Sequence, residues 1–206
     1  MKMDKRHKFS IKERKRQLVR EVIYQAALRL FLERGYDYVT VDEIAKEAGI
    51  SRRTFFHMFP SKEDVLLAYL DGVEIHMVQL LATRPNNEPL LISLRHAFKP
   101  LLDLHTEDAL ARNRIRLILD TPALRARHLK LLDSWAQLLA EQCAQKLGLY
   151  SIEGLPRLTA WIAIITLDVA LHEWSRQQDK ALLPYVDETF AKLSKVMRAK
   201  PKKNRS

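Results

Sequence analysis

The stretch Thr40-Val-Asp-Glu-Ile-Ala-Lys-Glu-Ala-Gly49-Ile-Ser-Arg-Arg-Thr-Phe-Phe-His-Met-Phe59 decides the fold of the first third of this chain. Thr40 and, three residues later, Glu43 form the capping-box pattern of one short helix, and Ser51 is placed as the N-cap of the next. Gly49 permits a tight turn between them. Two short helices joined by a glycine turn are typical of a helix-turn-helix, whose second helix enters the major groove of DNA.

The second helix has an inner and an outer face. Phe55 and Phe59 are four residues apart, so they share the face that packs inwards. Arginine can contact guanine with two hydrogen bonds, which discriminates between bases by about 1–3 kcal/mol. Two arginines on a short helix can also be an ordinary solvated face. Ser61, with Asp64 three residues later, is placed to cap a third helix. These three capped helices and the basic residues that precede them favour DNA over that alternative. The side chains expected to project outwards, or towards the helix N-terminus, are Arg52, Arg53, Thr54, Phe56 and His57.

A longer helix is predicted before this element. Apolar residues recur with helical spacing between Arg14 and Arg34, and Gly35 is placed to cap the C-terminus. Residues 1–13 precede this pattern and are interpreted as a flexible basic arm.

Residues from about Arg16 to Leu70 resemble the DNA-binding domain of TetR-type transcriptional regulators. The matching pieces are Ala26-Ala27…Leu30-Phe31…Gly35-Tyr36, Thr40-Val41…Ile44-Ala45…Ala48-Gly49-Ile50-Ser51 and Thr54-Phe55-Phe56…Phe59-Pro60-Ser61-Lys62-Glu63. The resemblance implies that Lys62, at the start of a fourth helix, contacts a backbone phosphate. The candidate DNA-binding residues are therefore Thr40, Ser51, Arg52, Arg53, Thr54, Phe56, His57 and Lys62.

This chain departs from the family pattern at three of these positions or their neighbours. Phe56 stands where a tyrosine is common, and Met58 stands where His or Tyr is frequent. Arg53 replaces a residue that is usually small, which adds a possible reader of bases. The operator sequence therefore cannot be inferred from relatives.

The rest of the chain also has helical patterns, so the predicted fold class is all-α. The pattern from Ser61 to about Ala82 predicts one helix long enough to bridge two domains, and Arg84–Pro89 is a polar break with two prolines. Further helices are predicted at Leu90–His105 (interrupted near Pro100), Ala109–Leu119, Leu124–Leu147, Leu155–Gln177 and Pro184–Met197. The predicted domains are 14–70 for DNA binding and 71–198 for effector binding and dimerisation, followed by a basic tail at 199–206.

The segment Ala160–Leu171 is apolar on all sides except for Thr166 and Asp168. Such a helix must be buried on more than one side. The family resemblance implies that the last two helices pair with their copies in a homodimer. A helix buried within the monomer core would have the same sequence pattern.

The resemblance also implies a small-molecule pocket between the middle helices. Asp168 and Trp161 are candidates to bind the effector there, and the alternative for Asp168 is a dimer-interface or intramolecular ion pair with Arg114 or Arg116. The other candidate pocket residues, each also explained by core packing, are Leu101, Leu104, His105, Leu119, Trp135, Leu138 and Ile165.

Two stretches narrow the class of effector. Residues 53–65 and the helix that ends at Trp174 resemble the actinobacterial regulators that include the mycofactocin-associated one. This resemblance implies a hydrophobic or acyl-thioester effector.

The positive charge is concentrated at the two ends of the chain. Residues 1–20 carry nine Lys or Arg against two acidic residues, and residues 192–206 carry seven and no acidic residue. The net charge is +10, so the body between these ends is mildly acidic. Basic ends suit contact with phosphate, although the second is equally explained as a solvated tail.

Composition argues against several classes of protein. The single Cys143 excludes an internal disulfide, and no apolar segment before Phe9 suggests a signal peptide. No apolar run approaches the roughly 18–20 residues that cross a bilayer. We therefore expect a cytoplasmic protein that binds double-stranded operator DNA and a small effector, with no membrane, metal or cofactor.

An enzyme and an architectural DNA binder are the rival classes. The seven histidines include no His-x-x-x-His pair, and the five glycines include no phosphate-binding loop, so we expect no enzymatic activity. An architectural binder would use the basic ends, but it would leave the large apolar-rich second part unexplained.

Overall fold

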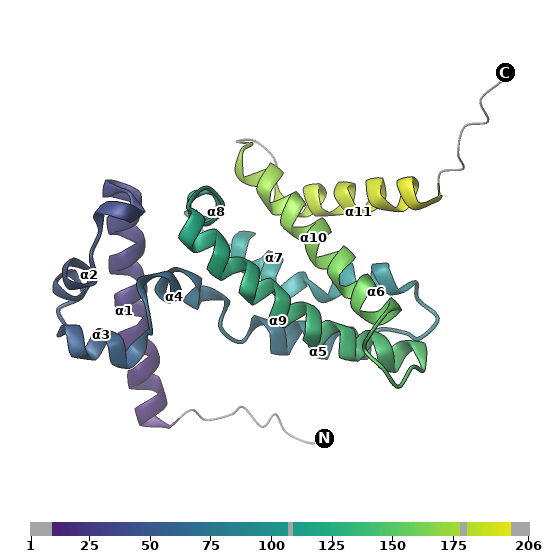
Figure 1. The fold of residues 1–206 in the computed structure, drawn as a ribbon, viewed down its shortest axis with the longest axis horizontal. Helices are drawn as coiled ribbons and strands as arrows, with labels where there is room; N and C mark the ends of the chain where they lie inside the picture. The colour runs from purple at the N-terminus through teal and green to yellow at the C-terminus, as the bar shows by residue number, and fades with distance from the viewer. Residues whose placement is uncertain (1–9, 107–108, 178–180, 199–206) are drawn as a thin grey trace, which may run out of the picture. The chain divides into compact units, whose positions relative to one another are not determined.

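The computed structural model describes residues 10–106, 109–177 and 181–198, and these residues form helices and connecting turns without a β-strand (Figure 1). The all-α prediction is therefore confirmed. The chain divides into two compact units between Tyr69 and Leu70. The basic tail predicted at 199–206 and most of the predicted N-terminal arm lie outside the described residues.

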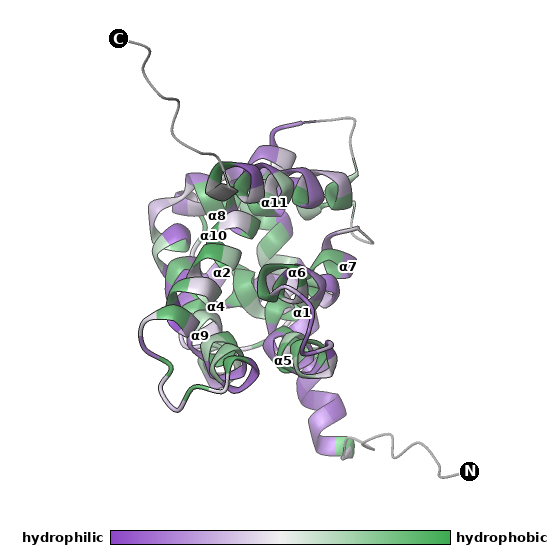
Figure 2. Ribbon diagram, turned by 90° about the vertical axis from the view of Figure 1, so that its right-hand side faces the viewer, coloured by the Kyte–Doolittle hydropathy of each residue, from purple (hydrophilic) through white to green (hydrophobic). Residues whose placement is uncertain are grey.

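The first unit begins with α1 (Ile11–Arg34), which starts three residues earlier than the sequence pattern predicts. Ser10 explains the early start, because its Oγ accepts a hydrogen bond from the Glu13 amide at 3.2 Å and the Glu13 carboxylate accepts one from the Ser10 amide at 2.7 Å. Residues 11–13 therefore belong to the helix and not to the arm. The first turns of α1 are exposed and mostly hydrophilic (Figure 2), and its second half packs into the core of the unit.

The helix-turn-helix follows as α2 (Val41–Glu47) and α3 (Arg52–Met58), after the short 3-10 helix η1 (Tyr36–Tyr38). Gly49 lies in the turn with a φ of 66°, a left-handed conformation that glycine adopts without a steric penalty. The helix α1 packs against α2, α3 and α4 (Lys62–Leu67), so it forms the scaffold of this unit. Its core contains Ile23, Phe31, Ile44, Phe55, Phe59 and Val65.

The single long helix predicted from Ser61 to Ala82 is not formed. The chain instead forms α4, the 3-10 helix η2 (Ala68–Leu70) and α5 (Val73–Thr83). Gly72 has a φ of 83°, which is incompatible with a continuing α-helix and places the break directly before α5. The apolar pattern runs through the break, which explains why periodicity alone predicted one helix.

The second unit contains α5 and the helices that follow it. Its central helices are α9 and α10, which pack on each other, and α8 packs on both. Phe98 separates α6 from α7, and Pro100 lies within the first turn of α7, where a missing N–H group is tolerated. The remaining bounds are α6 (Leu90–Ala97), α7 (Lys99–Thr106), α8 (Ala111–Asp120), α9 (Pro122–Leu147), α10 (Leu155–Ser175) and α11 (Leu182–Arg198).

The apolar helix α10 is surrounded by α6, α8, α9 and α11, as expected for a helix buried on more than one side. It nevertheless leaves an apolar row uncovered. Leu158, Ile165 and Val169 are spaced by seven and four residues, and all three are exposed. They therefore lie on one outer face of the helix.

Two segments, Lys62–Thr83 and Leu155–Ser175, meet the length and composition of a membrane span. The core helix of a soluble protein meets the same criterion. The first segment is interrupted at Gly72, and half of the most apolar window of the second is buried within the unit.

Cys143 is fully buried in α9. Burial raises the pKa of its thiol to about 11, because the charged thiolate is disfavoured away from water. The thiol is therefore protonated at neutral pH.

Candidate functional site

The helix α3 is fixed by its aromatic inner face. Phe55 and Phe59 are buried, and their rings lie 6.2 Å apart between centroids. This packing leaves Arg52, Arg53 and His57 exposed, together with the half-exposed Phe56. The structure thus brings the predicted DNA-reading side chains together on one helix.

The hydroxyl groups of the predicted set serve as local caps. Thr40 Oγ1 accepts the Glu43 amide at 3.3 Å and donates to the Glu43 carboxylate at 2.8 Å. Ser51 Oγ accepts the Thr54 amide at 3.1 Å and lies 2.9 Å from Thr54 Oγ1. The backbone N–H and side chain of Thr40 lower the pKa of Glu43. These caps fix the start of each helix.

The two arginines of α3 differ in their surroundings. Arg52 Nη1 donates to Asp42 Oδ2 at 2.6 Å, and the Arg52 guanidinium lies 5.2 Å from the centroid of the Phe56 ring. Arg53 makes no hydrogen bond or ion pair within the described ranges and extends into solvent. One arginine is therefore held in place, whereas the other is unconstrained.

The predicted phosphate contact requires a free ammonium group on Lys62, but this group is already engaged within the first unit. Its Nζ donates to the Tyr36 carbonyl at 3.0 Å and to the Val39 carbonyl at 3.1 Å, and it lies 4.0 Å from the Tyr36 ring centroid. Two of its three N–H bonds are thereby used within the unit. Lys62 fixes the loop before α2, and a phosphate contact, which would use its third N–H, stays a prediction.

Arg20 is a positioning residue that the sequence did not reveal. Its Nη1 donates to the Met58 carbonyl, the last of α3, at 2.6 Å, and its guanidinium lies 4.1 Å from the Phe59 ring centroid. A cation at a helix C-terminus is favourable because the carbonyl groups there are unpaired. Arg20 lies in the basic half of α1, where it could not be distinguished from solvated neighbours.

A second internal contact ties α4 to the loop before α2. The Tyr36 hydroxyl donates to the Glu63 carboxylate, and burial together with this hydrogen bond raises the pKa of Tyr36. Burial alone would raise the pKa of Glu63, but hydrogen bonds from Tyr36 and Ser61 lower it overall. The sequence signal for this contact was the tyrosine after Gly35, which belongs to the family pattern.

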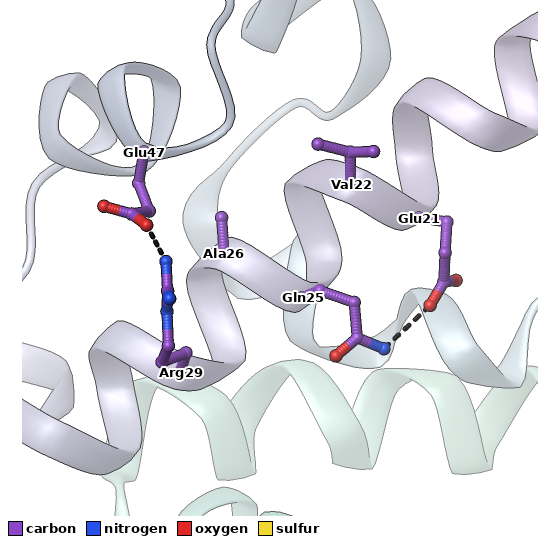
Figure 3. A pocket seen from close by; sticks show the side chains of 6 residues that line it. All are labelled: Glu21, Val22, Gln25, Ala26, Arg29 and Glu47. Atoms are coloured by element: carbon purple, nitrogen blue, oxygen red, sulfur yellow. Dashed lines mark hydrogen bonds and ion pairs between the residues drawn. The ribbon is translucent and has the colours of Figure 1, made fainter.

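The first unit also has an open surface hollow of about 430 Å³ between α1 and the end of α2 (Figure 3). Arg29 and Glu47 form an ion pair between α1 and α2, and Gln25 donates to Glu21 at 2.8 Å along α1. The lining residues are Glu21, Val22, Gln25, Ala26, Arg29 and Glu47, none of which belongs to the predicted DNA-binding set.

In the second unit, Asp168 is the centre of a buried polar cluster. Its two carboxylate oxygens accept hydrogen bonds from Arg125 Nη1 at 2.9 Å and Nη2 at 2.6 Å. His128 Nε2 lies 3.3 Å from Oδ1. The ion pair is therefore made with Arg125 of α9, and the predicted partners Arg114 and Arg116 were wrong. Both lie on α8, whereas α9 packs more extensively against α10.

The surroundings of Asp168 stabilise its charged form. Burial alone would raise the pKa of its carboxyl group, but the hydrogen bonds from Arg125 and His128 lower it well below its usual range. The same pairing raises the pKa of Arg125. Asp168 is thus a satisfied charge, which corresponds to the alternative of an intramolecular ion pair.

The other predicted pocket residues are not all buried. Leu101, His105 and Trp135 are buried, and Leu119 and Trp161 are partly exposed. The residues that the structure places on the surface, contrary to a role in lining an enclosed pocket, are Leu104, Leu138 and Ile165. Ile165 belongs to the outer face of α10, and a helical repeat cannot reveal which apolar face stays uncovered.

Two buried ring nitrogens on α9 make no hydrogen bond to any residue that the structure describes. Trp135 Nε1 and His128 Nδ1 are both inaccessible to solvent and make no hydrogen bond to any part of the chain that the structure describes. The two residues are seven positions apart, so they lie on one face of the helix. Buried polar groups are normally paired, and these two therefore offer hydrogen bonds to a bound molecule or water.

Among the described residues, no group of three or more His, Cys, Asp or Glu side chains is arranged to hold a metal ion.

Two family models match the chain in succession. Residues 23–69 match the model of bacterial regulatory proteins of the tetR family, and residues 88–198 match that of the MftR C-terminal domain.

Full-length relatives agree with these matches. A protein of Mycobacterium tuberculosis named as the mycofactocin biosynthesis transcriptional regulator MftR is 30% identical over 182 residues, which cover 86% of this chain and 90% of that protein. The transcriptional regulator TcmR of Streptomyces glaucescens is 30% identical over 180 residues, covering 84% and 80% of the two chains.

A solved structure has the same fold. The crystal structure of Thermus thermophilus FadR, a TetR-family repressor in complex with lauroyl-CoA, superimposes with a TM-score of 0.55 at 27% identity. The match covers 91% of this chain and 99% of that one.

Proposed function

The chain belongs to the TetR family of bacterial regulatory proteins, and we propose that it is a repressor that binds a palindromic operator as a homodimer and leaves it when a hydrophobic effector binds. The observation that carries this proposal is the α3 surface, where Arg52, Arg53, Phe56 and His57 are exposed together over a buried aromatic base. The resemblance to regulators of the mycofactocin type, inferred above from short stretches, is confirmed over most of the chain.

The exposed side of α3, together with the caps at the starts of α2 and α3, provides groups for binding an operator. Arginine fits the paired acceptors of guanine in the major groove, and the exposed caps at Thr40 and Ser51 lie where each helix begins. A dimer would place two copies of α3 about 34–36 Å apart, one helical turn of DNA. The operator is therefore expected to be a palindrome with half-sites at that spacing.

The uncovered face of α10 supports a homodimer. Leu158, Ile165 and Val169 form an exposed apolar row beside α11, which packs against α10. A two-fold interface uses the same patch on both copies, so an apolar row on one helix is self-complementary. Burial of this row would remove its apolar surface from water, which stabilises the dimer.

The effector is proposed to be a fatty-acyl thioester or a similar hydrophobic molecule. The relative from Thermus thermophilus holds lauroyl-CoA, and the second unit matches the C-terminal domain of MftR. Trp135 Nε1 and His128 Nδ1 are buried groups that a polar atom of such an effector would satisfy. An effector that binds one arrangement of the dimer better lowers the population of the other, and with it the affinity for DNA.

The curated relatives are transcriptional regulators, which points away from an enzyme. A regulator of bacterial genes acts on DNA in the cytoplasm, and we place this chain there.

Selection of genomic fragments by the purified protein tests the DNA-binding proposal. A specific repressor is expected to enrich a palindrome and to bind it at least about 10³-fold more tightly than random DNA. An architectural binder would enrich no common sequence, although its affinity would also fall steeply with salt. The latter result would replace the proposed function.

Addition of lauroyl-CoA to the operator complex tests the effector proposal. Release of DNA by lauroyl-CoA, with no release by free coenzyme A at the same concentration, is the expected result. Equal release by both would show that the acyl chain is not recognised, and no release by either would contradict an acyl-thioester effector.

A further inference from the structure

An acidic residue lies on the surface that is proposed to face DNA. Asp42 is in the first turn of α2, one residue beyond Val41, and its side chain is 64% exposed. A carboxylate near phosphate groups is repelled, so its presence there needs a physical reason. The contact that it makes supplies one.

Asp42 holds one edge of the Arg52 guanidinium. Asp42 Oδ2 accepts a hydrogen bond from Nη1 at 2.6 Å, across the turn between α2 and α3. Phe56, one turn further along α3, supports the guanidinium with its ring 5.2 Å away. Both contacts join residues on short, capped elements, which fixes the direction of the arginine side chain.

The other edge of the guanidinium stays available. Arginine has five N–H donors in a planar fork, and within the described part of the chain Asp42 takes only one of those on Nη1. The donors on Nε and Nη2 form a pair that matches the O6 and N7 acceptors of guanine. An arginine held at its far edge loses less rotational freedom when this second pair of bonds forms.

We propose that Asp42 is a positioning residue that determines base specificity, because it holds Arg52 with its free edge directed to a guanine. This inference rests on the proposed function. Asp42 repels DNA phosphates in general, so it also lowers the affinity for sequences that lack the matching base. Both effects increase the ratio of specific to non-specific binding.

A simpler role of Asp42 would be stabilisation of α2, since acidic residues in the first turn of a helix interact favourably with its dipole. Glu47 provides a matched control. It is also on α2, also exposed and also paired with an arginine, Arg29, but it lies at the opposite end of that helix beside the surface hollow. Removal of either carboxylate changes the net charge by one unit.

Selection of bound sequences from a random DNA library should be compared for the parent, Asp42→Ala, Glu47→Ala, Arg52→Ala and the Asp42→Ala/Arg52→Ala double variant. The expected result is that Asp42→Ala reduces the preference for one base in each half-site from about tenfold to about two- or threefold. Arg52→Ala should weaken the base preference at the same position. The double variant should lose no more preference than Arg52→Ala alone. Glu47→Ala should keep the parental preferences.

Each outcome of this experiment decides the matter. An unchanged base preference in Asp42→Ala, or the same loss in Glu47→Ala, would overturn the role of Asp42 and leave the proposed function intact. A loss at a position unaffected by Arg52→Ala would also overturn it. A parent protein that enriches no sequence would overturn the proposed function and this inference together. Thermal unfolding of each variant shows whether loss of preference reflects loss of fold.

Discussion

Two arginine–carboxylate pairs of this protein have the same closest distance and opposite surroundings. Arg52–Asp42 and Arg125–Asp168 both have an N···O distance of 2.6 Å. The side chains of the first pair are 60% and 64% exposed, and those of the second are 29% and 10% exposed. Water weakens the attraction within the first pair, and DNA can take the place of that water. The second pair is mostly enclosed by the helices of the second unit. Contact distance alone therefore does not distinguish a pair that is available for binding from one that stabilises the fold.

The largest expected difference is in stability. Asp168→Ala should lower the free energy of unfolding by about 2–4 kcal/mol, because it leaves the partly buried Arg125 without its partner. Asp42→Ala should lower it by no more than about 1 kcal/mol. Urea unfolding measured by circular dichroism compares the two variants, and equal losses would contradict the distinction between the pairs.

Acid should also act through the buried pair. The pKa of Asp168 is lower in the folded chain than in the unfolded chain, so its stabilisation is present above the unfolded value and lost as the pH falls. Stability should therefore decrease from about pH 4 downwards, near the ordinary pKa of Asp. Asp168→Asn should have a smaller decrease than the parent as the pH falls below about 4, because the loss in the parent continues down to the lower pKa of the folded state. Parallel pH profiles would assign acid sensitivity to other carboxyl groups.

Arg53 extends the comparison on the side that is proposed to face DNA. Asp42 holds Arg52, whereas no contact within the described structure constrains Arg53. Arg53→Ala should reduce operator affinity by about 1–3 kcal/mol and relax the preference at one base position. Gel-shift titration and sequence selection measure the two effects. An unchanged sequence preference with weaker binding would assign Arg53 to phosphate contact.

Arg20 is an arginine that faces inwards within the same unit. Arg20→Ala should destabilise that unit by about 1–2 kcal/mol, since it removes the hydrogen bond to the Met58 carbonyl and the contact with Phe59. Arg52→Ala serves as the exposed control and should change stability little. Similar melting temperatures for Arg20→Ala and the parent would show that α3 does not depend on this cap.

The smallest expected effect is the coupling between Arg52 and Asp42 in the absence of DNA. A double-mutant cycle should give at most about 0.5 kcal/mol, decreasing at high salt. The same cycle on Arg125 and Asp168 should give a larger value that salt changes less. Coupling of equal size and salt dependence would show that burial does not separate the pairs.

The sequence predicts local features of this protein well because they depend on neighbouring residues. The capping residues Thr40 and Ser51, the inward Phe55 and Phe59, and the exposed side of α3 all follow from spacing within a few positions. The two helices at Phe98 were likewise indicated by Pro100.

Breaks within a continuous apolar pattern, and contacts that depend on distant residues, could not be predicted. Periodicity could not reveal the break at Gly72, because apolar residues continue on both sides of it. The partner of Asp168 is 43 residues away in Arg125, and the choice between α8 and α9 is made by packing. The carbonyl partners of Lys62 are likewise set by how the loop before α2 folds back onto α4.

The buried Cys143 leaves no cysteine thiol on the surface of the second unit. Since the chain has one cysteine, and burial keeps its thiol protonated and enclosed, a thiol reagent gains access only when the surrounding helices open. The rate of its alkylation thus counts the openings of that unit alone. The alkylation rate of Cys143 therefore measures internal motion of the second unit without an added label. An effector bound among the same helices would slow this alkylation.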